Sequence, residues 1–132
     1  MSGDTTNWTE LREFFGVDIT RSFALSWQFE RSSLLIDLDL YLKAEHPYYE
    51  EPRPAEKACF RAAFLEFPEC TGASKAGVDV IDMDPDVISG IAPGAIAGLM
   101  RTGEGRYEIS GDFGVVNISS DRPLLKIKNL DQ

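Results

Sequence analysis

Residues 23–42 read FALSWQFERSSLLIDLDLYL, with hydrophobic side chains at every second position on both sides of a polar break. This period of two indicates two β-strands, each with one buried face. An antiparallel hairpin brings both apolar sets to the same side if Trp27 pairs with Leu38. That register leaves Ser32 and Ser33 as the turn, and because Ser-Ser is poor in such turns we expect a bulge nearby. The expected buried set of the first strand is Phe23, Leu25, Trp27 and Phe29.

More strands are expected after this hairpin. Residues 58–67 (ACFRAAFLEF) are apolar on both alternating sets, which predicts an interior strand covered on both faces. A short strand is expected at 77–81, and glycine-containing turns at 102–105 and 111–112 separate the strands of a C-terminal meander. The last strand, 124–129, alternates apolar residues with lysines, which deter pairing at a sheet edge.

The segment before the hairpin predicts one short helix over residues 7–15. Asn7 is a suitable N-cap, Glu10 stands at the capping-box position, and Gly16 ends the pattern. The predicted fold is therefore α+β, with this N-terminal helix packed on a mostly antiparallel sheet of six or seven strands that curls into a sandwich or partial barrel. Because 132 residues without a linker or repeat suit one domain, we expect a single domain over 1–132. The face that the helix would bury carries Trp8, Leu11, Phe14 and Phe15.

The charge balance limits the classes of partner. The chain has 22 acidic and 13 basic side chains and a formal net charge of −9. Nucleic acid and anionic membrane surfaces would repel such a protein, whereas a basic protein would be attracted. The polar start of the sequence lacks the features of a secretion signal, so we expect a cytoplasmic protein whose Cys59 and Cys70 are reduced thiols.

Two segments are candidate binding sites. The loop 46–54 reads HPYYEEPRP; its prolines stiffen it, and tyrosine and arginine are enriched where partners bind. The alternative for this loop is an ordered crossover that closes one end of the sheet. Residues 66–86 hold six acidic side chains against one lysine, which suits a basic partner, a solvated loop or, less well, a divalent cation. The candidate residues are His46, Tyr48, Tyr49 and Arg53 in the loop, and Asp79, Asp82, Asp84 and Asp86 in the acidic segment.

Catalytic and metal-binding patterns are incomplete. The acidic string that starts at Asp82 begins like a calcium loop, but valine and proline occupy the positions of the required glycine and glutamate. His46 is the only histidine, which excludes multi-histidine metal sites. Asp37 and Asp39 share a strand face, and with His46 they would suit a hydrolase only if the three side chains converge. We therefore predict no catalytic residues, no metal and no cofactor.

Several segments together resemble small uncharacterised bacterial β-rich proteins. These segments are FGVDIT (15–20), residues 24–42, the loop 46–54 and YEISGDFGVVNIS (107–119). The last of them, a strand, Gly-Asp-Phe-Gly and a second strand, is also similar to the C-terminal region of some immunity proteins, which neutralise a companion toxin. The resemblance implies a small acidic cytoplasmic protein that binds one partner, and it implies no catalytic residue.

Binding is accordingly the function that the sequence favours. We expect a non-enzymatic domain that binds a basic protein through the loop 46–54 and the acids of 79–86. A small-ligand module is the alternative, with a pocket inside the curved sheet lined by Trp27, Phe60 and Phe64. A hydrolase is less favoured, and an exposed sheet face would also allow a homodimer.

Overall fold

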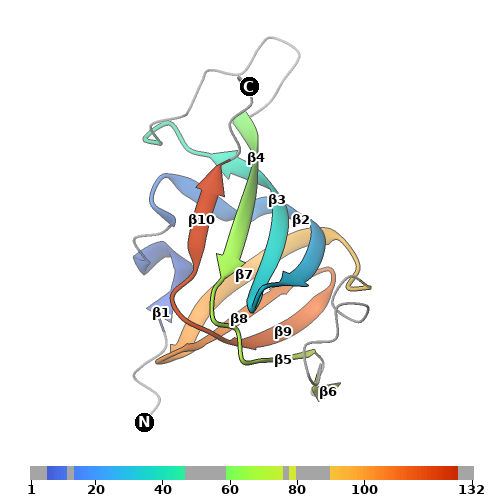
Figure 1. The fold of residues 1–132 in the computed structure, drawn as a ribbon. Coiled ribbons are helices and arrows are strands. Elements are labelled where there is room, and N and C mark those ends of the chain that lie inside the picture. Colours follow the sequence, from blue (N-terminus) through green and yellow to red (C-terminus); the bar gives the residue numbers. More distant parts are fainter. Residues whose placement is uncertain (1–5, 12–13, 47–58, 76–77, 80–89, 128–132) are drawn as a thin grey trace.

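In the computed structural model the regular secondary structure of the described residues is almost entirely antiparallel β-strand (Figure 1). The structure describes residues 6–11, 14–46, 59–75, 78–79 and 90–127. Within them the sheet has ten strands, in place of the predicted six or seven. The strands are β1 (Thr6–Asn7), β2 (Val17–Glu30), β3 (Ser33–Leu42), β4 (Cys59–Phe67), β5 (Gly72–Lys75), β6 (Val78–Asp79), β7 (Gly94–Gly103), β8 (Arg106–Gly111), β9 (Gly114–Ser119) and β10 (Leu124–Ile127).

The predicted N-terminal helix is wrong, and with it the α+β class. The described residues of this segment contain no α-helix: Trp8–Glu10 form a single 3-10 turn, η2, and Phe14 also has 3-10 conformation. Asn7 does cap this turn, since its side-chain oxygen accepts a hydrogen bond from the Trp8 amide at 2.8 Å. A helix is not needed for burial, because Trp8 and Leu11 already reach the core from a turn followed by extended backbone. Phe15, expected on the same face, is instead 66% exposed.

The strand order is β10-β4-β3-β2-β7-β8-β9-β5-β6, with β1 added beside β7. Every pairing between the described strands is antiparallel, which confirms the predicted antiparallel sheet. β2 and β7 pair only at Phe23 and Ala24 of β2. The sheet folds back on itself at this short pairing. As a result, β2, β3, β4 and β10 form one layer, and β7, β8, β9 and β5 form a second layer (Figure 1).

The hydrophobic core lies between these two layers. Every second residue of β3 from Leu34 to Leu42 is buried, as the alternation in the sequence predicted. Trp27 of β2 meets Phe113 of the β8–β9 turn edge-on, with ring centroids 5.2 Å apart. Phe67 of β4 and Tyr107 of β8 make a second contact across the layers at 5.6 Å. These aromatic contacts join the two layers across the core.

The β2–β3 hairpin has a register two residues away from the predicted one. Trp27 pairs with Ile36 and not with Leu38, and because the shift is even the same faces remain inward. The turn is formed by Arg31 and Ser32, whose φ angles are 52° and 67°. Two successive positive φ angles are typical of the tight hairpin turn that follows the twist of its strands. The turn is therefore one residue earlier than the sequence predicted.

Two bulges in β2 change which of its side chains face the core. The first lies between Asp18 and Phe23, and the second lies between Ala24 and Ser26. As a result Ala24 is buried, whereas Phe23 is 45% and Leu25 is 51% exposed. The predicted buried set was therefore wrong for Phe23 and Leu25, because a bulge reverses the alternation beyond it. A bulge was expected, but closer to the turn.

β4 is interior to its layer, as predicted, but only one of its faces is buried. Ala63, Leu65 and Phe67 point into the core, whereas Phe60 on the other side is exposed.

The C-terminal meander ends at β9, because β10 crosses to the first layer and pairs with β4. The outward side of this four-stranded layer therefore carries apolar residues as well as polar ones.

Candidate functional site

Among the loop residues predicted to bind a partner, His46 alone falls within the described residues. It follows β3, and its backbone amide donates a hydrogen bond to the Lys43 carbonyl at 2.9 Å. Partial burial lowers the pKa of the His46 imidazole, because removal of water disfavours its charged form. Tyr48, Tyr49 and Arg53 lie outside the described residues.

The acidic candidates are placed only in part. Asp79 ends β6, where its backbone pairs opposite Ser74 of β5. Asp82, Asp84 and Asp86 lie outside the described residues. Across the ranges that are described, no three histidine, cysteine or acidic side chains are grouped so that they could hold a metal ion.

The structure does not bring His46 to the two strand carboxylates. Asp37 and Asp39 are on the outward side of β3, as the alternation predicted. His46 lies against Gly16, beyond the end of β3 at Leu42. Leu42 is already about 10 Å along the strand from Asp39, at roughly 3.3 Å per residue. The three side chains therefore do not meet within hydrogen-bond reach in this arrangement.

The three aromatics proposed to line an internal pocket lie on two different sides of one layer. Trp27 is buried and faces the core. Phe64 pairs with Asp37, an outward residue of β3, and Phe60 pairs in the same way with outward Tyr41. The strand register therefore separates Trp27 from the two phenylalanines.

The outward side of β2, β3, β4 and β10, which we call the outer face, gathers exposed apolar side chains. Four of the six large hydrophobic residues that are exposed in the described part of the chain lie on it. A solvated sheet face normally carries polar residues at these positions. The four residues are Phe23, Leu25, Phe60 and Leu124.

Two carboxylates of β3 lie in the middle of the outer face. Asp39 stands between Phe23 of β2 and Ala62 of β4. Burial raises the pKa of Asp39, because its apolar neighbours withhold water from the charged form. Asp37 accepts a hydrogen bond from the Ser26 hydroxyl at 2.9 Å. The centre of the face thus combines negative charge with an apolar surrounding.

At one end of the outer face an arginine already lies against an aromatic ring. Arg21, in the first bulge of β2, places its guanidinium 5.3 Å from the ring centroid of Tyr41. Its Nε lies 3.4 Å from a carboxylate oxygen of Asp18. The Tyr41 ring contacts Phe60 edge-on, with centroids 5.5 Å apart. The face therefore accommodates a cation between an aromatic ring and a carboxylate.

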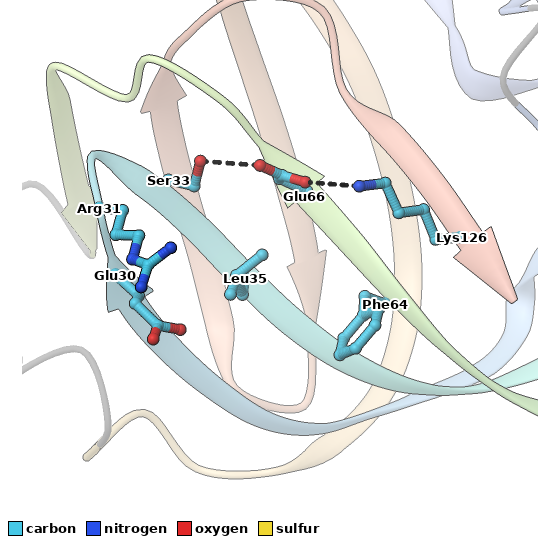
Figure 2. A pocket seen from close by; sticks show the side chains of 7 residues that line it. All are labelled: Glu30, Arg31, Ser33, Leu35, Phe64, Glu66 and Lys126. Atoms are coloured by element: carbon cyan, nitrogen blue, oxygen red, sulfur yellow. Dashed lines mark hydrogen bonds and ion pairs between the residues drawn. The ribbon is translucent and has the colours of Figure 1, made fainter. Parts of the chain in front are cut away.

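At the other end, beside the β2–β3 turn, the outer face is hollowed into an open groove of about 390 Å³ (Figure 2). Glu66 accepts a hydrogen bond from the Ser33 hydroxyl at 2.8 Å and forms an ion pair with Lys126 at 3.4 Å. Leu35 and Phe64 supply the apolar part of the lining. The groove is lined by Glu30, Arg31, Ser33, Leu35, Phe64, Glu66 and Lys126.

The sequence interpretation missed the outer face as a site. It assigned Phe23 and Leu25 to the core, because the period of two continued through the position of a bulge. One signal was present: residues 58–67 are apolar on both alternating sets, so one apolar side of that strand must point away from the core. The same pattern also fits a strand covered on both faces, and the exposed Phe60 shows that this second interpretation is wrong.

Comparison with known proteins identifies no relative of this chain. No protein family, curated protein or solved structure matches the chain. Over the residues that the structure describes, no helix is long and apolar enough to cross a membrane. The function is therefore argued from the outer face itself.

Proposed function

We propose that this protein is a non-enzymatic binding domain that holds a basic protein partner against its outer face. The observation that carries the proposal is the concentration of exposed apolar side chains on one side of a single layer. Burying apolar surface contributes about 25 cal/mol per Å², so covering these side chains favours association. Large exposed apolar patches in soluble proteins mark interaction sites, whereas single exposed residues need no explanation.

The charge of the outer face selects the kind of partner. Asp37 and Asp39 lie at its centre, and the whole chain carries a formal charge of −9. A second copy of the chain docked face to face would bring like carboxylates together in a desolvated interface, which is unfavourable. A basic protein supplies the opposite charge, and long-range attraction would also speed its association.

The resemblance of residues 107–119 to immunity proteins supports the same kind of function, with a companion toxin as the partner. The proposal includes a cytoplasmic setting, which suits Cys70 as a buried free thiol. The loop 46–54 and the acids of 79–86 remain candidate contacts of the same complex.

The test compares three versions of the tagged full-length protein in capture experiments from a lysate of the source organism. The versions are the wild type, the face variant Phe23→Ser/Leu25→Ser and the control variant Val115→Ser. Val115 is 40% exposed on β9 in the other layer, so its substitution removes a similar side chain outside the outer face. Bound proteins are identified by mass spectrometry at low and high salt, and thermal melts check that each version folds.

We expect one stoichiometric basic protein that binds the wild type and the control, leaves at high salt and is lost from the face variant. Retention of the same partner by the face variant would contradict the proposal, as would capture of no stoichiometric partner. Self-association that is lost in the face variant would show instead that the face joins two copies of the chain.

A further inference from the structure

Ala62 is the smallest side chain in the middle of the outer face. It lies on β4 beside Asp39 of β3, and Phe60 and Phe64 occupy the positions two residues before and after it. Side chains two apart on a strand share one face and are about 6.5–7 Å apart, so the two rings stand on either side of a methyl group. Figure 2 shows Phe64 projecting from β4 on the outward side. Phe60, Ala62 and Phe64 thus form a row along β4, which we call the aromatic row. It has a small side chain at its centre and an aromatic ring at each end.

Asp39 supplies a negative charge beside this row. It is partly buried between Phe23 and Ala62, and within the described residues no cation forms an ion pair with it. Glu66, by contrast, has Lys126 as its partner at 3.4 Å. Partial burial without a counter-charge destabilises the ionised carboxylate in the free protein. A cationic side chain of a binding partner would offset this destabilisation of the Asp39 carboxylate.

Lysine and arginine side chains match this combination of features. Each has an apolar stem that packs against aromatic rings and a cationic end that binds a carboxylate. Aromatic faces also attract cations directly. The chain uses the same arrangement at the end of the outer face, where Arg21 lies over Tyr41 and contacts Asp18.

We propose that the partner places a lysine or arginine side chain over Ala62, with its stem between Phe60 and Phe64 and its cationic group at Asp39. This inference rests on the proposed function and deepens it, because it names the chemistry of the partner's central contact. A partner with a neutral or acidic side chain at that position would leave Asp39 desolvated without a counter-charge. The carboxylate therefore also discriminates against such partners.

The test uses isotope-labelled full-length protein and two small probes, N-acetyl-arginine amide and N-acetyl-citrulline amide. The two probes have nearly the same shape, but only the arginine probe is charged. Amide chemical shifts are followed by two-dimensional NMR at constant ionic strength. We expect saturable shifts centred on Asp39, Ala62 and Phe23 with the arginine probe, and binding weaker by about tenfold or more with the citrulline probe.

Two variants separate the charge from the aromatic row. Asp39→Asn removes the charge with little change of shape, and Ala62→Leu keeps the charge but fills the position between the rings. Each is expected to weaken binding of the arginine probe by about tenfold or more. Glu108→Gln is the control, because Glu108 lies in mid-strand on β8 of the other layer, and we expect it to leave binding unchanged. The NMR spectrum itself reports whether each variant is folded.

Equal binding of the two probes would overturn the inference, as would unchanged binding of the arginine probe to both Asp39→Asn and Ala62→Leu. The proposed function is judged separately by the captured partner. If the partner is lost from Phe23→Ser/Leu25→Ser but held by Asp39→Asn, the outer face binds it without this cationic contact. If the partner is held by every variant, the outer face is not the interface.

Discussion

The buried hydroxyl of Ser22 accepts a hydrogen bond from the backbone amide of Tyr41 at 2.9 Å and donates one to the Asp18 carbonyl at 2.8 Å. Between Asp18 and Phe23 the regular pairing of β2 with β3 is interrupted by a bulge. The Ser22 side chain therefore replaces a missing main-chain partner and holds the two strands together across the bulge. The same bulge precedes outward Phe23, so this bond supports the outer face.

Loss of the Ser22 hydroxyl is expected to destabilise the fold. Ser22→Ala leaves the Tyr41 amide without its acceptor in a buried position, which lowers the free energy of unfolding by about 1–3 kcal/mol. Ser26→Ala is the control, because its hydroxyl bonds Asp37 on an exposed surface and its loss should change that free energy by at most about 1 kcal/mol. Urea unfolding of both variants measures the difference. Equal losses would show that the bulge does not depend on Ser22.

Gly111 is expected to tolerate no side chain. A Cβ at this position would overlap the Ala95 carbonyl oxygen and lie 2.8 Å from the Phe113 ring. That oxygen also accepts a hydrogen bond from the Asp112 amide at 3.0 Å, which keeps it in place. Gly111→Ala should therefore lower the free energy of unfolding by about 1–3 kcal/mol. Gly103→Ala, where no atom lies within 4 Å of the added Cβ, should stay within about 1 kcal/mol of the wild type in the same denaturation experiment.

The β2–β3 turn offers a stabilising substitution. Ser32 has a φ of 67°, a left-handed conformation that strains a residue with a Cβ by about 1–2 kcal/mol. Ser32→Gly removes that strain but adds about 0.5–1 kcal/mol of chain entropy to be lost on folding, so we expect a net gain of up to about 1.5 kcal/mol. The Ser32 carbonyl keeps its bond from the Cys70 amide at 2.7 Å. Ser32→Gly should therefore have a higher melting temperature than the wild type. Ser33→Gly, which loses the hydroxyl hydrogen bond to Glu66, should have a lower melting temperature than the wild type.

The parts of the fold that could be predicted are those in which local pattern and tertiary packing agree. β3 alternates without a break, and the four inward residues that its alternation indicated are all buried, namely Ile36, Leu38, Leu40 and Leu42. The inward side chains of β2 were predicted wrongly at Phe23 and Leu25, because a bulge separates these residues from Trp27. A bulge depends on how β2 pairs with β3, and the alternation within β2 does not reveal it. The N-terminal segment carries good helix-capping residues, yet β1 pairs with β7 immediately before Trp8, so the chain has to turn there.

The candidate site shows the same limit. The loop 46–54 and the acids of 79–86 were chosen by composition, and composition does not reveal which surfaces a fold brings together. Phe23 and Ala62 are both neighbours of Asp39 only because β2 and β4 flank β3, and β10 extends this face only because it leaves the meander. Such pairings join segments far apart in the chain, so no local pattern predicts them.

Asp39 is expected to make the free protein less stable at neutral pH. Burial raises the pKa of this carboxyl in the folded state, so the unfolded chain releases the proton first as the pH rises. The folded state is therefore stabilised relative to the unfolded state at low pH, and this contribution is lost as the pH rises through the folded pKa. Asp39→Asn removes the titration, so the variant should be more stable than the wild type near pH 7.

Urea unfolding of the wild type and Asp39→Asn at a series of pH values down to about 4 measures this difference, which should shrink as the wild-type carboxyl becomes protonated. Asp39→Asn is thus expected to raise the free energy of unfolding and, in the NMR experiment, to weaken binding of the arginine probe. Opposed effects of this kind distinguish a binding group from one that supports the fold. If Asp39→Asn were less stable than the wild type near pH 7, the carboxylate would instead serve the folded state of the free protein.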